Sequence, residues 1–484
     1  MTQLFVASTL FGALTLAAAV DAGCFDERAD GDRLLLLCNT APLPEVAPEL
    51  DELPGFAVVR ARFDRVLRWS TTIAPHDATT WRPGDAAVDV LGPLLREHWG
   101  LTDGPVELVL ESLAVDPSRT LARLVPEAVL TVYADGLMSC GPTRDDLPMT
   151  TARRISRLLH LDLVPGLEPL LLREHGVPAV AVPHAAFRAV VQEVAAACGQ
   201  QVRACAVGDE PHALLLGQYL APLAILTRRE EEDLHLRMLR SAVAQGLRTV
   251  VVKAHPAAPA ALSERLAAEA RRCGVRLLEL PASLPVEVWY AERRPALVVG
   301  CFSTGLVTAA GLYDLCAARV GTDLVLQRLT PYENSNRIPL VIVDAVLPPA
   351  TVTGDCRTAR HPWGGPERPS ALPDLVAAVG YCMQSRRLEH LRPVAERVLT
   401  ERAGPGLDRW FRRRRLSALG LPGGMAPRPR PEPPASRPPR PDRTLTGQVL
   451  ARCPGPVRAL APVLRRALRR SRRRGAPSAP RSSP

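Results

Sequence analysis

Aromatic residues, paired cysteines and long apolar runs are scarce or missing in this 484-residue chain, and each absence excludes a class of protein. Phe, Trp and Tyr make up only 4% of the residues, so the core must be built from Leu, Val and Ala. The eleven cysteines include no C-x-x-C pair, which argues against a zinc module or a disulfide framework and favours a reducing compartment. Beyond the amino terminus no run of 18 apolar residues occurs, so a membrane-spanning helix is not expected.

Two common phosphate-binding loops are also absent. The chain contains neither a G-x-x-x-x-G-K-[ST] loop nor a G-x-G-x-x-G turn, and its ten histidines show no metal-ligand spacing. We therefore expect neither a P-loop nucleotide site nor a metal cofactor.

Positive charge is concentrated in the carboxyl-terminal tail. Residues 428–481 contain 15 arginines and two acids, so this tail has a net charge of about +13. Because the net charge of the whole chain is +10, the rest of the chain has a net charge of about −3. Nucleic acid is therefore not expected as a partner of the globular part. Residues 457–474 would form a basic amphipathic helix suited to an anionic membrane surface, and the alternative is a solvated, disordered tail.

The first 20 residues are as apolar as a signal peptide but lack positive charge at their start. We interpret residues 4–7 as a first strand and residues 10–20 as a first helix. Ser8 and Thr9 form the loop and helix cap between them. This interpretation predicts a cytoplasmic protein, peripheral at the inner face of the membrane if the tail binds there. Export with processing at Cys24 is the alternative.

Short apolar runs alternate with helical patterns along most of the chain. The predicted strands cover residues 4–7, 33–39, 56–59, 106–110, 128–133, 213–217, 249–252, 275–280 and 296–300. The predicted helices cover residues 10–20, 87–99, a segment ending near 200, 230–244, 261–273, 284–292, a segment from 306, 393–402 and 407–416. The alternation predicts an α/β protein with mostly parallel sheets. Two consecutive α/β units predict an enzyme with a cleft between domains at residues 1–200 and 201–418, followed by a tail at residues 419–484.

Residues able to carry chemistry follow several of these strands, where open α/β sheets bind ligands. Asp135, followed by Gly136, could be a general base or an ordinary turn aspartate. Lys253 and His255 lie on one side of an extended segment, so they could contact a phosphate or protonate a leaving group. The alternative for His255 is a satisfied surface histidine.

Two further positions belong to the second half of the chain. Glu287 lies near a predicted helix start, where it could bind ribose hydroxyls or simply favour the helix dipole. Ser303 and Thr304 stand between a strand and a helix, so their hydroxyls could form an anion site or merely an N-cap.

The order of these residues resembles that of bacterial sialyltransferases with the two-domain GT-B fold, and above all the bacterial alpha-2,8-polysialyltransferase family. Those enzymes share an acidic-acidic-glycine motif, a His-Pro motif and a later serine pair. The matching segments are Ala134-Asp135-Gly136, His255-Pro256 and Ser303-Thr304, within a resemblance that runs from Leu4 to Arg337. Two positions depart from the pattern: Ala134 replaces the first acid, and Thr304 replaces a serine.

The resemblance implies a GT-B glycosyltransferase that uses CMP-sialic acid as donor and a glycan as acceptor, with no metal required. Asp135 would deprotonate the acceptor hydroxyl, and His255 would bind the CMP phosphate and act as the general acid. Ser303 and Thr304 would hold the phosphate, and Glu287 the ribose. The donor-binding residues that it implies are Ser8, Thr9, Gly136, Lys253, Pro256, Glu287, Ser303 and Thr304.

Two other functions remain open from the residues alone. His-Pro and paired hydroxyls would serve any CDP- or CMP-linked donor, so a surface-polymer transferase that uses CDP-glycerol is one alternative. A non-catalytic, exported envelope binding protein is the other.

Overall fold

The computed structural model describes residues 1–25, 31–41, 44, 47–101, 104–134, 136–205, 207–208, 210–254, 260–350, 371–401 and 408–425. The chain divides into a compact unit at residues 1–426 and a second unit at residues 427–484. Asp135, His255 and Pro256 lie outside the described residues, and so does the predicted amphipathic segment at 457–474.

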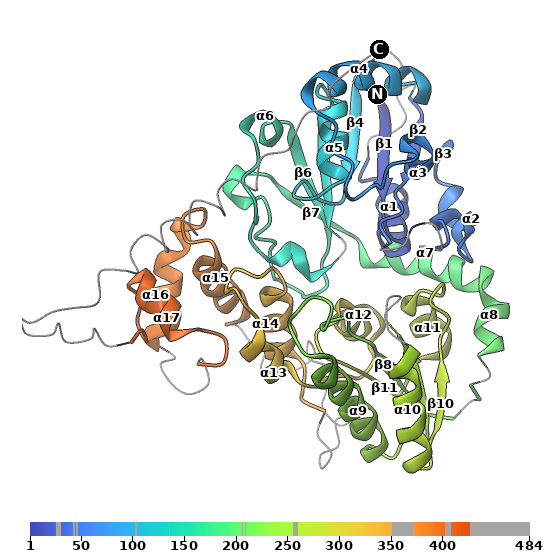
Figure 1. The fold of residues 1–484 in the computed structure, drawn as a ribbon, viewed down its shortest axis with the longest axis vertical. Coiled ribbons are helices and arrows are strands. Elements are labelled where there is room, and N and C mark those ends of the chain that lie inside the picture. Colours follow the sequence, from blue (N-terminus) through green and yellow to red (C-terminus); the bar gives the residue numbers. More distant parts are fainter. Residues whose placement is uncertain are drawn as a thin grey trace, which may run out of the picture. The chain divides into compact units, whose positions relative to one another are not determined.

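The strands of the described residues form two sheets, and every pairing between neighbouring strands is parallel (Figure 1). The first sheet has the order β3-β2-β1-β4-β5-β6-β7 and the second the order β10-β9-β8-β11-β12. The strands of the first sheet are β1 (Thr2–Ala7), β2 (Arg33–Leu37), β3 (Arg65–Arg68), β4 (Val106–Leu110), β5 (Val129–Ala134), β6 (Ile155–Leu161) and β7 (Ala179–Val182). Those of the second are β8 (His212–Leu216), β9 (Thr249–Lys253), β10 (Arg276–Glu279), β11 (Leu297–Gly300) and β12 (Ala317–Arg319).

Helices connect the strands and cover the sheets. In the first part of the chain they are α1 (Leu10–Asp21), α2 (Phe56–Arg60), α3 (Trp69–Ile73), α4 (Asp85–Trp99), α5 (Ser118–Leu124), α6 (Met149–Ala152), α7 (His184–Ala197) and α8 (Gly199–Ala204). They continue as α9 (Arg228–Ala244), α10 (Ala260–Arg272), α11 (Val286–Arg293), α12 (Thr304–Tyr313), α13 (Thr322–Arg328), α14 (Arg337–Val346), α15 (Leu372–Met383), α16 (Arg392–Glu401) and α17 (Arg413–Leu419). Short 3-10 turns are η1 (Leu50–Glu52), η2 (Leu137–Cys140), η3 (Arg173–His175) and η4 (Glu389–Leu391). The two helix-covered parallel sheets confirm the predicted α/β class with two Rossmann-like parts.

Each sheet has a point where the strand order reverses. Strands β2 and β3 lie on one side of β1 and β4 to β7 on the other, while β9 and β10 lie on one side of β8 and β11 and β12 on the other. The connections leave opposite sides of the sheet at such a point, which opens a crevice at the carboxyl ends of the strands. The carboxyl ends of β1, β4 and β5, and of β8, β9 and β11, are therefore the places to look for a site.

The core follows the alternation of each strand. Phe5 packs into one cluster of buried residues, whereas Leu4 and Val6 belong to a second cluster on the other face of the first sheet. This is the two-residue period of a strand buried on both faces. Helix α7 contacts α1 beside the first sheet and α11 beside the second, so it joins the two parts of the core.

Three details of the predicted secondary structure are wrong. Residues 56–59, predicted as a strand, form helix α2, because Phe56 and Val59 are three residues apart and both are buried on the face toward α7. Strands β3, β6, β7 and β12 were not predicted. Charged or exposed residues interrupt the apolar patterns of the first three, and β12 has only three residues. The predicted closing helix at 407–416 begins only at Arg413.

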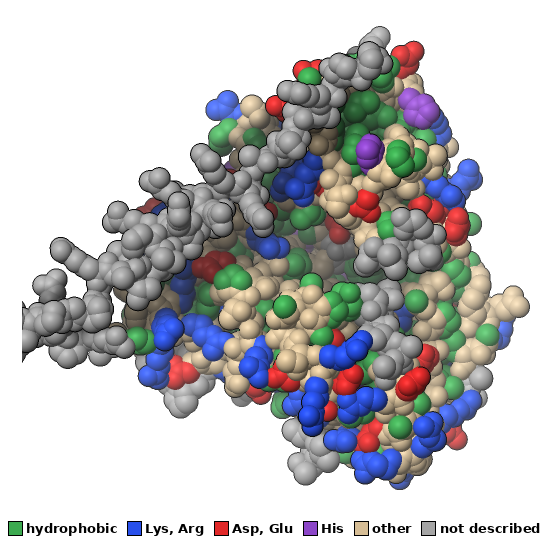
Figure 2. All heavy atoms as spheres, viewed as in Figure 1, with side chains coloured by type: hydrophobic (Ala, Val, Ile, Leu, Met, Phe, Trp, Pro, Cys, Tyr) green, Lys and Arg blue, Asp and Glu red, His purple; other side chains and the backbone are tan. Residues whose placement is uncertain are grey.

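Positive and negative side chains are mixed on the surface over α9 and α10 (Figure 2). Arg240 and Arg272 both contact Glu269 there, at 2.7 Å and 2.5 Å. Within the described residues, no helix has both the length and the apolar character needed to cross a membrane.

Candidate functional site

Polar residues follow three neighbouring strands of the first sheet. Ser8 comes after β1, Glu111 after β4, and Asp135 follows the last residue of β5 in the sequence. The hydroxyl of Ser8 donates a hydrogen bond to Oε2 of Glu111. Thr9 acts differently, because its Oγ1 accepts from the backbone N–H of Gly12 at 2.9 Å and caps α1. The predicted cap is thus confirmed for Thr9, while Ser8 lies against a carboxylate.

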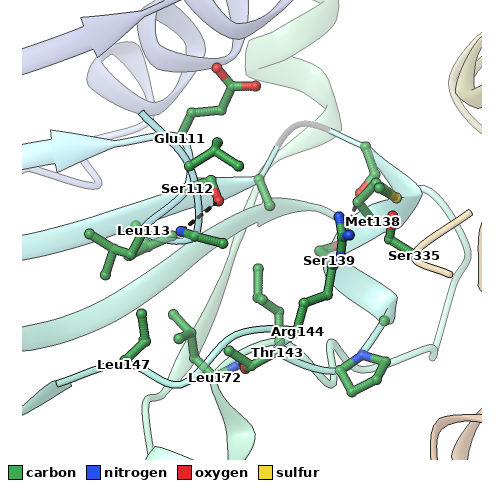
Figure 3. Close-up of a pocket in the computed structure, with 18 of the residues that line it drawn as sticks. Glu111, Ser112, Leu113, Met138, Ser139, Thr143, Arg144, Leu147, Leu172 and Ser335 are labelled. Atoms are coloured by element: carbon green, nitrogen blue, oxygen red, sulfur yellow. Dashed lines mark hydrogen bonds between the residues drawn. The ribbon is translucent and has the colours of Figure 1, made fainter. Parts of the chain in front are cut away.

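A cavity of about 290 Å³ adjoins this edge of the first sheet (Figure 3). The residues on both sides of Asp135, Ala134 and Gly136, line it. Glu111 is the one carboxylate among the described residues that line the cavity, and Arg144 is the one cation. Ser335 and Met383, from the later part of the chain, complete the wall. A site with mostly apolar walls and a few polar groups is typical of small-molecule binding.

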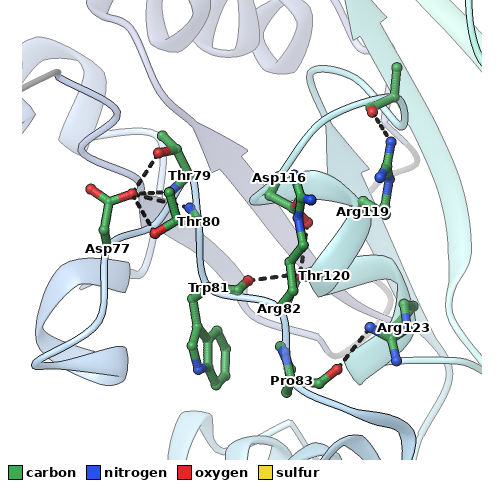
Figure 4. Close-up of polar contacts among 11 residues, drawn as sticks. Asp77, Thr79, Thr80, Trp81, Arg82, Pro83, Asp116, Arg119, Thr120 and Arg123 are labelled. Carbon is green, nitrogen blue, oxygen red and sulfur yellow. Dashed lines mark hydrogen bonds and ion pairs between the residues drawn. The ribbon is translucent and has the colours of Figure 1, made fainter. Parts of the chain in front are cut away.

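The segment after β4 forms one wall of the cavity, and polar contacts hold it in place (Figure 4). Asp116, one residue beyond the lining segment 111–115, accepts hydrogen bonds from Arg82 at 2.6 Å and from Thr120 at 2.8 Å. Arg123 donates to the carbonyl of Pro83 at 3.0 Å, which holds the segment before α4 against α5. The loop that carries Glu111 is therefore anchored at its far end.

In the second sheet, Lys253 ends β9 and is the only lysine of the chain. Its ammonium donates to the carbonyl oxygens of Pro281, Ala282 and Leu284, each at 2.8 Å. Burial lowers the pKa of this ammonium to about 8, although the nearby charge of Glu287 acts in the opposite direction. Lys253 thus holds the loop that leads into α11, and its predicted contact with the donor stays a prediction.

Glu287 stands in the first turn of α11 and its side chain is buried. Burial raises its pKa to about 7, against the effects of a backbone hydrogen bond and of the charge of Lys253. One turn later, the hydroxyl of Tyr290 donates to the carbonyl of Gly305 at 3.0 Å and so ties α11 to the start of α12. The predicted ribose contact of Glu287 is not tested by these contacts.

Ser303 and Thr304 begin α12, directly after β11. The Oγ of Ser303 accepts from the backbone N–H of Gly305 at 3.2 Å, which is the N-cap role considered for it. Thr304 is the first residue of the helix. A hydroxyl pair at the N-terminus of a ten-residue helix could also bind an anion, which remains a prediction.

The carboxyl edges of the two sheets meet at Gly136. A Cβ atom placed on this glycine would lie 3.1 Å from Oγ1 of Thr304. Gly136 is thus in direct contact with the start of α12, and the absence of a side chain permits this approach. The structure brings together the residue after Asp135 and one member of the predicted phosphate-binding pair.

Sequence reasoning missed Glu111 and Arg144. Glu111 immediately follows the apolar strand at residues 106–110, which is the same signal that identified Asp135 and Lys253. Arg144 lies in a loop without any pattern, so only its place in the cavity reveals it. Among the described residues, no group of His, Cys, Asp and Glu is arranged to hold a metal ion.

A family model described as alpha-2,8-polysialyltransferase (POLYST) matches residues 3–321. The chain belongs to the alpha-2,8-polysialyltransferase family. It is therefore a glycosyltransferase of the sialyl-transferring kind, as the motifs predicted. The two Rossmann-like sheets agree with the GT-B fold expected for it.

Comparison with solved structures finds more distant likenesses. UDP-GlcNAc 2-epimerase from Methanocaldococcus jannaschii is 12% identical, with a TM-score of 0.42 over 79% of this chain and 100% of that one. The GT-B domain of a sialyltransferase from Photobacterium damselae is 13% identical, with a TM-score of 0.41 over 71% of this chain and 96% of that one. ADP-heptose LPS heptosyltransferase II from E. coli is 11% identical, with a TM-score of 0.34 over 66% of this chain and 84% of that one. No curated protein matches the sequence.

Proposed function

We propose that the protein transfers sialic acid from CMP-sialic acid to a hydroxyl group of a glycan acceptor. The contact between Gly136 and Thr304 carries this proposal, because it brings the segment of the predicted base next to the predicted phosphate-binding pair. A base and a leaving-group site on facing edges are what a displacement at a sugar carbon needs.

In this reaction the acceptor oxygen forms a bond to the anomeric carbon while the bond from that carbon to the CMP phosphate oxygen breaks. Asp135 takes the proton of the attacking hydroxyl. His255 and the hydroxyls of Ser303 and Thr304 stabilise the charge that develops on the departing phosphate. These groups make a metal ion unnecessary, and attack opposite the leaving group inverts the anomeric configuration.

The loop held by Lys253 supports the donor side of the proposal. The three hydrogen bonds from its ammonium fix the segment 281–284, which leads directly into α11 and Glu287. We assign the ribose hydroxyls of CMP to Glu287, and the fixed loop before α11 supports this assignment. A fixed acceptor of hydrogen bonds loses little entropy when the nucleotide binds.

The test is the release of CMP by purified full-length protein. We expect release from CMP-sialic acid to rise when a sialylated glycan is added, and the glycan to gain the mass of one or more sialic acid residues. Thermal shifts with CMP, CDP, UDP and GDP in parallel should show the largest stabilisation for CMP, because a ligand that binds only the folded state stabilises it. Consumption of CDP-glycerol without consumption of CMP-sialic acid would replace the proposal with the CDP-glycerol alternative.

A further inference from the structure

Glu111 lies at the carboxyl edge of the first sheet, after the middle one of the strands β1, β4 and β5, and neither the sequence motifs nor the proposed reaction gives it a role. It directly follows β4, which pairs with β1 on one side and with β5 on the other. Its neighbours at this edge are therefore Ser8, after β1, and the segment of Asp135, after β5. Two carboxyl groups thus follow adjacent strands at the place where the acceptor must be activated.

Among the described residues, the hydrogen bonding of Glu111 involves only one of its two carboxylate oxygens. Oε2 accepts from the hydroxyl of Ser8. The described part of the chain offers Oε1 no hydrogen-bond partner and gives the carboxylate no ion pair. Burial raises the pKa of Glu111, and the bond from Ser8 opposes that effect. A desolvated carboxyl group without a cation is costly to a fold, and such groups are concentrated at functional sites.

Three hydroxyl groups that line the cavity hold its loops. Ser112 accepts from the backbone N–H of Ala114 at 3.3 Å, and Thr143 accepts from that of Leu172 at 2.9 Å. Ser139 donates to the carbonyl of Gly136 at 3.0 Å. Figure 3 shows Glu111 and Ser112 at the end of β4, with Ser139 and Arg144 on the facing loop. Glu111 therefore differs from these three hydroxyls, because within the described ranges only its Oε2 takes part in a hydrogen bond.

We propose that Glu111 binds a hydroxyl group of the acceptor sugar through Oε1, while Ser8 fixes the other oxygen of the same carboxylate. The acceptor hydroxyl donates and the carboxylate accepts, which fixes the orientation of the sugar at this edge of the first sheet. Glu111 is thus a specificity-determining residue for a polyhydroxylated acceptor. This inference rests on the proposed transfer reaction.

Glu111→Gln tests the inference, because the amide oxygen still accepts from Ser8 while the carboxylate is lost. We expect kcat/KM for the acceptor to fall about 10- to 100-fold, the range of a lost hydrogen bond to a charged group. The CMP-induced thermal shift and the slow hydrolysis of CMP-sialic acid without acceptor should not change. Ser8→Ala should lower kcat/KM for the acceptor less, by about 3- to 10-fold, because the carboxylate remains but is less well held.

Acceptors that lack single hydroxyl groups separate binding from a structural effect. With the wild-type enzyme, removal of the one hydroxyl group that Glu111 binds should lower kcat/KM for the acceptor about 10- to 100-fold. With Glu111→Gln, the same deoxy acceptor should show no further decrease in kcat/KM, as in a double-mutant cycle. Glu107→Gln, in β4 itself, is the control. Its carboxylate bonds Gln3, Thr131 and Arg157, so this change should lower thermal stability and leave the discrimination between acceptors intact.

Two results would overturn the inference while the proposed function stands. One is a Glu111→Gln variant that folds and transfers sialic acid to every acceptor with the same kinetics as the wild-type enzyme. The other is the failure of both Glu111→Gln and Glu111→Asp to fold, which would make the residue structural. The absence of any transfer by the wild-type enzyme would instead refute the proposed function itself.

Discussion

The carboxyl edges of the two sheets are built alike but use their polar groups differently. At the second sheet, Lys253 donates to three carbonyl oxygens, Ser303 caps α12, and Tyr290 joins α11 to α12. At the first sheet, Glu111 lines a cavity and has one hydrogen-bond partner among the described residues. The difference is one of preorganisation: the second edge is fixed by its own hydrogen bonds, whereas the first leaves groups and space for a ligand.

This contrast fits the two substrates of the proposed reaction. A nucleotide presents the same phosphate and ribose in every cycle, so rigid groups can bind it without reorganising. A glycan acceptor can vary in length, and an open cavity with few polar groups accommodates that variation.

The largest effect is expected where each edge contributes its proposed acid or base. Asp135→Ala and His255→Ala should each lower kcat about 10³-fold, because general acid–base groups contribute between 10² and 10⁴. Thermal unfolding should remain within a few degrees of the wild type. Asp89→Ala and His390→Ala change exposed residues of the same types and serve as controls. Transfer at the wild-type rate by either site variant would remove that residue from the mechanism.

The buried Glu287 should make stability at the second edge depend on pH. Its pKa of about 7 in the folded protein lies above the ordinary value of 4.5, so the folded state holds the proton more tightly. The contribution of Glu287 to the free energy of unfolding is therefore fully present below pH 4.5 and is lost as the pH rises through 7. This loss is on the order of 3 kcal/mol. Urea unfolding between pH 4.5 and 7 should show that the free energy of unfolding falls more with pH in the wild type than in Glu287→Gln. Parallel curves would mean that Glu287 ionises normally.

Replacement of Lys253 should loosen the second edge. Lys253→Ala leaves three carbonyl groups without their donor, which should cost about 2 kcal/mol of folding stability and weaken CMP binding about tenfold. Lys253→Arg should retain little of this stability and CMP affinity, because a planar guanidinium cannot direct three N–H groups to converging carbonyls as an ammonium does. Thermal shift with CMP measures both effects, and the exposed Arg248, just before β9, gives the control Arg248→Ala. Full CMP affinity in Lys253→Ala would show that the loop does not depend on this residue.

The smallest effect is expected at the contact between the edges. Gly136→Ala would place a methyl group 3.1 Å from Oγ1 of Thr304, so we expect a loss of about 1 kcal/mol in stability. Gly136→Ala combined with Thr304→Ala should recover most of that loss, because the second change removes the crowded oxygen. Gly84→Ala, where a Cβ meets no atom within 4 Å, is the control glycine. Equal stability of the single and double variants would argue against the contact.

The strands that position the site were predictable because their signal is local. The apolar runs at β1, β4, β5, β9 and β11 are buried on both faces, and polar residues follow each of them. The run at residues 56–59 was misread for the same reason. Four apolar residues suit a buried strand or one helical turn equally, and packing against α7 decides between them. Strand β6 escaped prediction because its Arg157 is paired with Glu107, 50 residues earlier.

The α/β class, the order of the chemical groups and the family could be predicted, since they depend on short local segments and on their order along the chain. Which of these groups meet depends on the tertiary structure. Ser8 and Glu111 are 103 positions apart, and Gly136 touches Thr304 across two sheets. Such pairings depend on strand order and on the packing of whole sheets, which no short segment encodes.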